Sequence, residues 1–516
     1  MNIIPRPVQL TPKPGSFSFT PGVVIVAHGR TTPIARKLAS LLAPPTGTWS
    51  PVQASAGKAE RVIRLSINSR LKKLGPEGYR LSVTPQGIDA QAYQEAGLFY
   101  AIQTLRQLLP PQVYRAAPVG PLDWQIPCVE IEDMPRFRWR GMHLDVGRHF
   151  MPKSFIMKMI DLLALHKLNT FHWHLTEDQG WRIQIKQYPR LTEVGAWRKE
   201  TLVGHWSDHP QQPVFDGKPH GGFYTQEDVR EIVAYAKERY ITVLPEIELP
   251  GHCQAAIAAY PELGNTGRQI QVSTSWGIHE DVFNVEENTI LFLQNVLEEV
   301  LELFPSPFIH IGGDEVPKKH WQESPAAQKR LLELGLKDEA ELQSYFIRRM
   351  DAFLTNRGRR LIGWDEILEG GLAPNATVMS WRGESGGIAA ANAGHDVVMA
   401  PNQYTYLDYF QDDPEKEPLG IGGYLPLEKV YTYEPVPSAL SSKAAQHVLG
   451  AQAQLWTEYM PNSRQVEYMA FPRLCALAEV VWTPPTNKDY SDFLSRLKIH
   501  LARLEALDVN YWKPTA

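Results

Sequence analysis

Two adjacent carboxylates, Asp314 and Glu315, follow a short apolar run and two glycines in the stretch Phe308-Ile309-His310-Ile311-Gly312-Gly313-Asp314-Glu315. The apolar run predicts a buried strand, and the glycines predict a turn that ends it. A strand that ends in such a turn can direct acid groups into a pocket, where paired carboxylates can divide acid–base and electrostatic roles. An isolated Asp-Glu pair is equally compatible with a solvated loop, so this stretch alone leaves both interpretations open.

The composition indicates a soluble globular protein. The 516 residues are 43% hydrophobic and 21% charged, with a formal net charge of −5. This weak net charge argues against nucleic-acid or anionic-membrane partners, and no apolar run is long enough to span a bilayer. The three cysteines, Cys128, Cys253 and Cys475, are far apart and form no C-x-x-C pair. We therefore expect no disulfide framework, no metal and no cofactor.

The first residues, Met1-Asn2-Ile3-Ile4-Pro5-Arg6-Pro7, lack the charged leader and apolar stretch of an export signal. We expect either a cytoplasmic protein or the mature form of an exported one. The sequence does not predict the oligomeric state.

Residues 1–132 predict a small α+β domain. Strands are expected at 23–27, 61–67 and 79–83, and a helix at 96–109 that stops before two prolines. The proline-rich stretch 117–135 has the composition of a connector. We therefore place a domain boundary near 133.

Residues 133–516 predict a (β/α)8 TIM barrel with a C-terminal helix. Strands are expected at 141–146, 169–175, 241–247, 308–312, 360–364, 377–381, 395–399 and 448–455. Helical stretches at 154–167, 225–239, 288–304, 338–357 and 387–393 alternate with them. Alternating β and α segments favour a parallel sheet, and eight such units close into a barrel. The last helix, 489–507, is expected to pack on the outside of the barrel.

Polar and aromatic residues gather just after each expected strand, where a barrel carries its active site. In chain order they are Asp145 and Arg148; His172, His174, Glu177 and Asp178; Glu246, Glu248 and His252; Asp314 and Glu315; Trp364, Asp365 and Glu366; Trp381 and Arg382; Tyr406 and Asp408; and Trp456 and Glu458. Three tryptophans at one rim favour a sugar pocket, because indole faces stack on sugar rings and can enclose an acetyl methyl group.

These motifs resemble the family 20 glycoside hydrolases, the β-N-acetylhexosaminidases. The resemblance rests on His310-x-Gly312-Gly313-Asp314-Glu315, Leu144-Asp145-Val146-Gly147-Arg148-His149-Phe150, His172-x-His174-Leu175-Thr176-Glu177-Asp178-Gln179-Gly180-Trp181-Arg182, Pro245-Glu246-Ile247-Glu248-Leu249-Pro250-Gly251-His252, Gly363-Trp364, Ser380-Trp381-Arg382-Gly383, Tyr406-Leu407-Asp408 and Leu455-Trp456-Thr457-Glu458. The N-terminal domain resembles the small α+β domain of the same family through residues 97–105.

The resemblance implies a retaining mechanism in which the 2-acetamido group of the substrate is the nucleophile, an exception to the two-carboxylate scheme. By position, Glu315 would be the general acid and base, and Asp314 would orient the acetamido N–H and stabilise the positive charge. We expect Asp314 to stay ionised and its charge to raise the pKa of Glu315.

Binding roles carry over in the same way. Tyr406 resembles the hydroxyl that holds the acetamido oxygen, and Trp364, Trp381 and Trp456 resemble the walls around the methyl group. Arg148 and Glu458 match the ligands of the non-reducing-end hydroxyls, and Asp408 matches a ligand of the 6-hydroxyl. Asp178, Glu248 and His252 resemble the polar network that supports the acid.

One residue departs from the family pattern. Glu248 stands where the family usually has Asp, so its link to His252 could be shifted or mediated by water. His172 and His174 share one face of a strand, which fits a metal pair or, more commonly, histidines that support other residues.

The implied function is exo-acting removal of terminal N-acetylglucosamine or N-acetylgalactosamine from β-linked glycans. A metal-dependent barrel hydrolase and a non-catalytic sugar-binding homologue are the alternatives. The sequence leaves open the sugar epimer, the natural polymer and the linkage. It also leaves open whether the polar loop from Thr201 to Gly222 shapes the aglycone side or is a plain surface loop.

Overall fold

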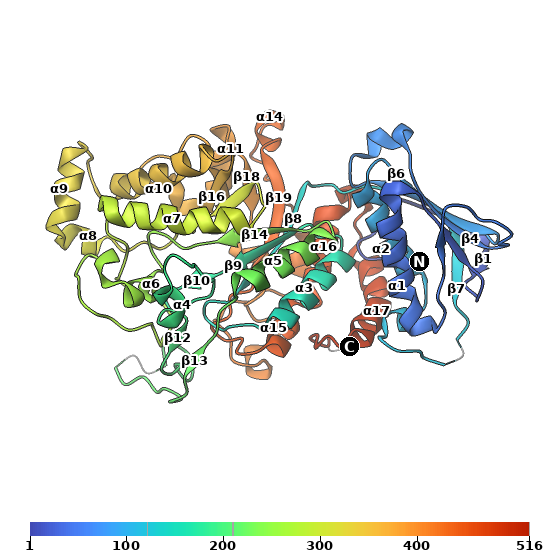
Figure 1. The fold of residues 1–516 in the computed structure, drawn as a ribbon, viewed down its shortest axis with the longest axis horizontal. Helices are drawn as coiled ribbons and strands as arrows, with labels where there is room; N and C mark the ends of the chain where they lie inside the picture. The colour runs from blue at the N-terminus through green and yellow to red at the C-terminus, as the bar shows by residue number, and fades with distance from the viewer. Residues whose placement is uncertain (121, 209–210, 515–516) are drawn as a thin grey trace. The chain divides into compact units, whose positions relative to one another are not determined.

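The computed structural model describes residues 1–120, 122–208 and 211–514 (Figure 1). These residues divide into two compact units. The first contains Met1–Arg140, Leu162–Leu168 and Ala470–Ala516, and the second contains Gly141–Asp161 and Asn169–Met469. Across the described ranges, every helix is too short or too polar to cross a lipid bilayer.

A closed barrel of eight parallel strands forms the larger unit, as the sequence predicts. Its strands, in order around the barrel, are β8 (Trp139–Asp145), β9 (Thr170–His174), β14 (Thr242–Glu246), β15 (Phe308–His310), β16 (Arg360–Trp364), β17 (Thr377–Ser380), β18 (Val397–Met399) and β19 (Val448–Ala453). The long helices between them are α3 (Lys153–Leu165), α5 (Gln226–Lys237), α7 (Glu287–Leu303), α10 (Glu339–Thr355) and α11 (Ser385–Asn392). The expected strands and helices all exist, with ends shifted by one or a few residues.

Short elements occupy the loops of this unit. They are β10 (Thr176–Glu177), β11 (Gly180–Trp181), α4 (Arg190–Glu193), β12 (Trp197–Arg198), β13 (His220–Gly221), α6 (Gln254–Ala259), α8 (Lys319–Glu323), α9 (Pro325–Glu333), α12 (Asn402–Thr405), α13 (Leu427–Thr432), α14 (Ser442–Ala445) and α15 (Ser463–Ala470). The loop expected from Thr201 to Gly222 includes residues 209 and 210, which lie outside the described residues.

Buried polar side chains fill part of the barrel interior. Strands β8, β9 and β19 are buried along their whole length, as parallel strands covered on both faces should be. Yet His143, His172, Glu246, His310 and Gln452 on these and neighbouring strands are fully buried. Buried polar groups generally need partners, and among these Gln452 bonds His172 while Glu246 bonds His174.

A seven-stranded mixed sheet forms the other unit, in the order β1-β7-β5-β6-β4-β2-β3. Its elements are β1 (Gln9–Ser18), β2 (Val24–Val26), α1 (Thr32–Thr46), β3 (Val52–Gln53), β4 (Val62–Ile67), β5 (Tyr79–Val83), β6 (Gly87–Ala92), α2 (Glu95–Leu108) and β7 (Gln125–Asp133). The predicted α+β architecture is therefore present.

The expected connector at 117–135 is wrong over its second half, because β7 is a strand between β1 and β5. The prolines in this stretch led to the wrong prediction of a connector. Pro127 pairs with Ser16 of β1 but lies beyond the end of the β5 ladder, which begins at Val129. A proline there interrupts no hydrogen bond to β5. Residue 121 of the expected connector lies outside the described residues.

The last long helix, α17 (Tyr490–Ala506), belongs to the unit that contains the mixed sheet, as does α16 (Arg473–Trp482). Arg496 donates to the carbonyl oxygen of Ile3 at 2.8 Å and pairs with Glu479 at 2.7 Å. Arg503 donates to the carbonyl oxygen of Gln107 at 2.7 Å. From the sequence, this helix was grouped with the barrel. The domain division at 133 stays a prediction.

Candidate active site

Glu246, at the end of β14, lies at the centre of a buried cluster in the barrel. Its carboxylate is 2.5 Å from His174 Nδ1, 3.0 Å from His172 Nε2 and 2.7 Å from His310 Nδ1. Trp364 Nε1 donates to Oε1 of the same carboxylate at 2.9 Å. Burial opposes the charge of Glu246, but His310, His174 and His172 hold its pKa well below the ordinary value. The cluster in the barrel interior therefore fixes the position of the Trp364 indole.

The two histidines of β9 have different charges. Gln452 donates to Nδ1 of His172 at 2.9 Å, so Nε2 carries the proton and lies 3.0 Å from Glu246, and burial lowers the pKa of His172 to about 4. Burial would lower the pKa of His174 too, but Glu246 and Glu177 outweigh burial and raise it to about 10. His174 thus bonds two carboxylates, while Nε2 of His172 lies beside the carboxylate of Glu246. A metal ion would have to displace these bonds.

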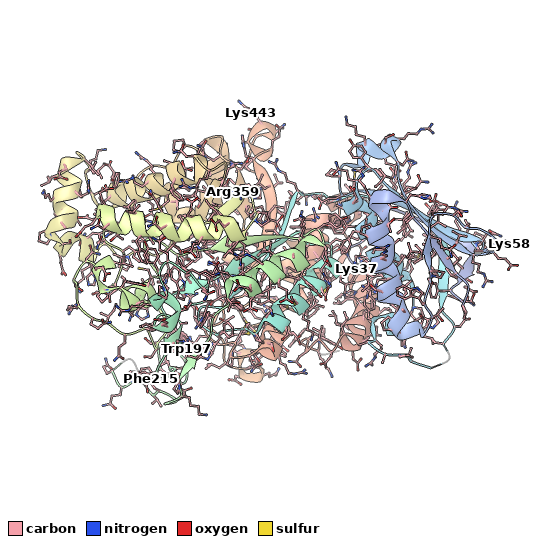
Figure 2. The ribbon with its side chains drawn as sticks, in the orientation of Figure 1. Lys37, Lys58, Trp197, Phe215, Arg359 and Lys443 are labelled. Atoms are coloured by element: carbon pink, nitrogen blue, oxygen red, sulfur yellow. The ribbon has the colours of Figure 1, made fainter. Side chains whose placement is uncertain are left out.

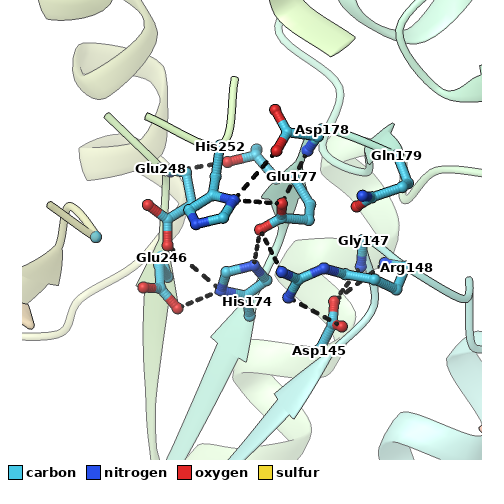
Figure 3. A network of polar contacts seen from close by, with 12 residues as sticks. Asp145, Gly147, Arg148, His174, Glu177, Asp178, Gln179, Glu246, Glu248 and His252 are labelled. Carbon is cyan, nitrogen blue, oxygen red and sulfur yellow. Dashed lines mark hydrogen bonds and ion pairs between the residues drawn. The ribbon is translucent and has the colours of Figure 1, made fainter. Parts of the chain in front are cut away.

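Glu177 connects three cationic side chains (Figure 3). Its carboxylate lies 3.1 Å from His174 Nε2, 3.4 Å from Arg148 Nη2 and 2.9 Å from His252 Nδ1. Burial opposes ionisation, yet Arg148 and His252 hold the pKa of Glu177 well below its usual range. One carboxylate therefore joins the barrel cluster, Arg148 and the histidine beside the acid pair.

Arg148 is held by carboxylates on several loops. Asp145, at the end of β8, lies 3.4 Å from its Nη1 and accepts its backbone N–H at 3.1 Å. Glu458, after β19, lies 3.9 Å from Nη2. The guanidinium carbon sits 5.0 Å from the ring centroid of Trp456. Arg148 thus presents a fixed cation beside an indole, as a site for sugar hydroxyls requires.

Close packing explains the two glycines before the acid pair. A Cβ on Gly312 would lie 1.7 Å from Oε2 of Glu248, and one on Gly313 would lie 2.7 Å from Cγ2 of Ile367. Both glycines have positive φ, +67° and +94°. Glu315 itself has φ +48°, a conformation that is uncommon for a side chain of this kind. The turn is therefore specified in detail, which is typical of a loop that positions reactive groups.

His252 faces both carboxylates of the acid pair. Its Nε2 lies 3.4 Å from Oε2 of Glu315 and 3.7 Å from Oδ2 of Asp314. On the other side of the ring, Nδ1 lies 3.1 Å from Oδ2 of Asp178, in addition to its contact with Glu177. Burial would lower the pKa of His252, but Glu177 and Asp178 raise it well above the ordinary value. His252 is thus a buried imidazolium between two pairs of carboxylates.

The two acids differ in exposure. Asp314 is 8% exposed, and its Oδ1 is buried with no hydrogen-bond partner among the described residues. The side chain of Glu315 is 34% exposed. Burial raises the pKa of Asp314 to about 7, His252 opposes the rise, and Glu315 adds to it. The expectation of a fully ionised Asp314 therefore does not account for its burial, which favours the neutral form.

Four aromatic rings enclose the space near the acid pair. The indoles of Trp364 and Trp456 lie 5.7 Å apart, Tyr406 lies 6.4 Å from Trp456, and Trp381 stacks on Tyr406 at 6.0 Å. Glu366 accepts the indole N–H of Trp381 at 2.9 Å. We call these four rings the aromatic cage. Asp408 and Trp456 also line one small cavity, so the structure brings the predicted site residues together at one end of the barrel.

Glu248 does not contact His252 as the family resemblance suggested. Its nearest ion pair among the described residues is with His174 Nδ1, at 3.8 Å, and neither carboxyl oxygen accepts a hydrogen bond there. Burial, with Asp314 and Glu246 nearby, raises its pKa well above the ordinary value. Glu248 is therefore a buried carboxyl group whose ionisation is disfavoured and which packs against Gly312.

Glu177, Glu246 and Glu366 were noted after their strands without a role in the site, and His174 was expected to be half of a metal pair or a histidine that supports other residues. Two signals were available. Glu246 and Glu248 are two apart, so they share one side of the chain as it leaves the strand, and Glu177 directly precedes Asp178. Their partners, however, come from other strands, and the sequence does not pair them.

Comparison with known proteins agrees with this geometry. The model of the glycosyl hydrolase family 20 catalytic domain matches residues 137–485, and the model of domain 2 of that family matches residues 1–134. A β-hexosaminidase of Porphyromonas gingivalis is 47% identical over 100% of this chain, which spans 64% of that relative. A β-hexosaminidase of Vibrio furnissii is 39% identical over 93% of this chain and 76% of its own.

Solved structures agree as well. The exo-β-N-acetylglucosaminidase of Vibrio harveyi in complex with N-acetylglucosamine superposes with a TM-score of 0.87 at 37% identity. That match covers 100% of this chain and 79% of the other. The fold, the arrangement of the site and these matches together show that the chain belongs to glycosyl hydrolase family 20.

Proposed function

We propose that the protein is an exo-acting, retaining β-N-acetylhexosaminidase that uses substrate-assisted catalysis. The observation that carries this proposal is Oδ1 of Asp314, a buried acceptor that finds no donor among the described residues, near the aromatic cage. A buried acceptor without a partner is costly, so a ligand that supplies a donor there gains free energy. The N–H of a 2-acetamido group is such a donor, and the cage suits its methyl group.

The reaction would proceed in two steps. The acetamido carbonyl oxygen attacks C1, the bond from C1 to the leaving oxygen breaks, and Glu315 gives its proton to that oxygen. The product is a cyclic oxazolinium ion. Glu315 then takes a proton from water as the water oxygen bonds to C1, and the ring opens to restore the acetamide with retained configuration. Asp314, held as a carboxylate, would stabilise the cation, and its electrostatic role is larger in a water-poor site.

The remaining residues would bind and orient the sugar. Tyr406 would donate to the acetamido oxygen, and Arg148 and Glu458 would hold the non-reducing-end hydroxyls. Asp408 would bind the 6-hydroxyl. His252, with Asp178 and Glu177 behind it, would keep Glu315 in place, and Glu248 would support Gly312 rather than His252.

The substrate would be a glycan with a terminal, β-linked N-acetylglucosamine or N-acetylgalactosamine. The names of the relatives and the N-acetylglucosamine in the Vibrio harveyi structure support this substrate class. Aryl β-glycosides of both epimers should be hydrolysed, and the aryl glucoside, which lacks the acetamido group, should not. Equal rates for the glucoside and the N-acetylglucosaminide would refute substrate assistance.

The same assay separates a metal-dependent hydrolase from this proposal. His174 bonds Glu246 and Glu177, and Nε2 of His172 lies 3.0 Å from Glu246, so we expect turnover to be unchanged after treatment with a chelator. Loss of activity with chelator and recovery with added zinc would favour the metal-dependent mechanism.

A further inference from the structure

The segment from Ile311 to Lys318 carries both acids of the candidate site, and we call it the acid loop. It joins β15 to α8 and forms no helix or strand. Three of its residues, Gly312, Gly313 and Glu315, have positive φ. A side chain such as Glu315 keeps this conformation only where the surrounding structure holds it. The contacts of the acid loop therefore decide where its carboxylates point.

Backbone hydrogen bonds hold only the first part of the acid loop. The N–H of Ile311 donates to the carbonyl oxygen of Ile362 at 3.0 Å, and the carbonyl oxygen of Gly312 accepts the N–H of Trp364 at 2.9 Å. Within the described chain, residues 313–317 make no hydrogen bond from backbone to backbone. The stretch that contains the acid pair therefore depends on side chains for its position.

Gln343 of α10 supplies such a contact. Its side chain is buried, its Nε2 donates to the carbonyl oxygen of Gly313 at 2.8 Å, and its Oε1 accepts a hydrogen bond from Nζ of Lys318. Both ends of the amide are used, so its orientation is fixed by the donor on one side and the acceptor on the other. One helical side chain thus joins the residue before Asp314 to the third residue after Glu315.

Helix α10, which packs beside α7, is a fixed support for this contact (Figure 1). Asp338 caps the start of α10 by accepting the backbone N–H of Glu341 at 2.9 Å. Just beyond the other end, Arg359, labelled in Figure 2, donates its backbone N–H to the carbonyl oxygen of Leu354 at 3.0 Å. The amide of Gln343 is therefore presented by a helix that is closed at both ends, which preorganises its bond to the acid loop.

Electrostatic interactions hold Lys318 in its place beside Gln343. Burial lowers the pKa of Lys318 to about 8, while nearby carboxylates, first of all those of Glu369 and Glu339, oppose the fall. Its Nζ also lies 5.6 Å from the ring centroid of Trp321. The ammonium group is therefore mostly charged at pH 7 and is attracted to carboxylates around it, which favours the conformation that bonds Gln343.

We propose that Gln343 and Lys318 are positioning residues that hold the acid loop where Glu315 can give its proton to the leaving oxygen. This inference rests on the proposed function and deepens it. Both residues act through the loop, because Gln343 bonds a backbone oxygen and Lys318 bonds Gln343. A general acid must come within about 2.6–3.2 Å of the oxygen that it protonates, and a displacement of about 1 Å can lower a rate by about 10²-fold.

Gln343→Met keeps the length of the side chain and removes both hydrogen bonds. The substrate is an alkyl β-glycoside of N-acetylglucosamine, whose leaving oxygen needs the proton. We expect kcat to fall by about 10- to 100-fold and KM to stay within about threefold of the wild-type value, because Arg148, Glu458 and the aromatic cage are left in place. An unchanged kcat would overturn the inference. A wild-type protein that hydrolyses neither this glycoside nor the aryl one would overturn the proposed function itself.

The matched control is Gln107→Met, on α2 of the other unit. Gln107 is also a buried glutamine on a long helix, and its amide bonds the backbone N–H of Ile4 at 2.9 Å and the carbonyl oxygen of Ile4 at 2.7 Å. This variant should lower the melting temperature and leave kcat unchanged. If Gln107→Met and Gln343→Met lowered both quantities equally, the loss of turnover would reflect stability alone, and the inference would fail.

Variants of Lys318, which is only partly buried, test the other half of the link without emptying the core. Lys318→Met should lower kcat by at least about threefold, and Lys318→Arg, which keeps a cationic donor, should retain most of the wild-type kcat. The double variant of Gln343→Met with Lys318→Met should be no slower than Gln343→Met, since both residues act through one link. Independent losses in the double variant, or an arginine variant as slow as Lys318→Met, would overturn the inference.

Discussion

The indole N–H of Trp364 donates to the carboxylate of Glu246 at 2.9 Å, and both side chains are almost completely buried. Trp364 is a wall of the aromatic cage, while Glu246 also bonds His174 of β9 and lies 2.7 Å from Nδ1 of His310 of β15. The same carboxylate therefore stabilises the barrel interior and sets the position of a ring in the site.

A comparison of Glu246→Gln with Trp364→Phe should separate the effect of Glu246 on stability from its effect on the position of the Trp364 ring. Gln puts an N–H₂ where imidazole donors point, and breaking a buried ion pair costs about 3–5 kcal/mol. We expect a clear fall in melting temperature together with a higher KM. Trp364→Phe removes one donor but leaves the imidazoles paired with Glu246, so it should raise KM with a smaller loss of stability. Equal melting temperatures for the two variants would contradict the central place of Glu246.

Glu315→Gln removes the proton that the leaving oxygen needs. We expect kcat/KM to fall by about 10²–10⁴ for alkyl glycosides and much less for aryl glycosides, whose leaving groups need little protonation. Steady-state rates for a series of leaving groups measure this dependence. The matched control is Glu323→Gln, an exposed glutamate at the end of α8. An equal loss of kcat/KM for all leaving groups would show that Glu315 is not the general acid.

The barrel was predictable because its signal is local. Strands such as β16 and β18 are short, mainly apolar runs that each follow a helix, so each unit could be recognised by itself. Strand β7 was missed for the opposite reason. Its pairing with β1 and β5 is set by partners far away in the chain, and its prolines suggested a connector.

The sequence predicted which residues form the site better than it predicted which of them are charged. Asp314 and Glu315 could be named from one motif, but the pKa of Asp314 depends on burial by residues from several strands. The role of Glu177 likewise depends on Arg148 and His252, which come from two other loops. Sequence spacing predicts which end of the barrel a residue occupies, whereas its partners follow from closure of the barrel.

The pKa of Asp314 makes a prediction about stability. Its value in the folded protein, about 7, is above that of an unfolded aspartate, so the charged form is disfavoured by folding. The cost is fully present above about pH 7 and disappears as the pH falls toward about 4. Asp314→Asn should therefore raise the melting temperature at pH 8 and have little effect at pH 5, although kcat falls at both. A melting-temperature difference that grows as the pH falls would contradict the raised pKa.

The same pKa predicts the acidic limb of the activity profile. If Asp314 must be ionised to stabilise the oxazolinium ion, kcat/KM for an aryl N-acetylglucosaminide should fall as the pH drops below about 7. In Asp314→Asn this limb should be absent from the residual activity. If the acidic limb stays unchanged in Asp314→Asn, a titrating group other than Asp314 causes it.

Gly312 and Glu248 form a pair whose coupling can be measured. Gly312→Ala places a methyl group where Oε2 of Glu248 now lies, 1.7 Å from the new Cβ, and adds strain because φ is +67°. Glu248→Ala should remove the clash but not the strain, which costs about 1–2 kcal/mol for a non-glycine residue. We therefore expect Gly312→Ala alone to lower the melting temperature strongly and to abolish activity. The double variant should recover most of the stability and part of kcat, because the carboxyl oxygens of Glu248 accept no hydrogen bond from the part of the chain that the structure describes. Additive effects of the two substitutions on the melting temperature would show that Glu248 does not shape the turn that presents Asp314 and Glu315.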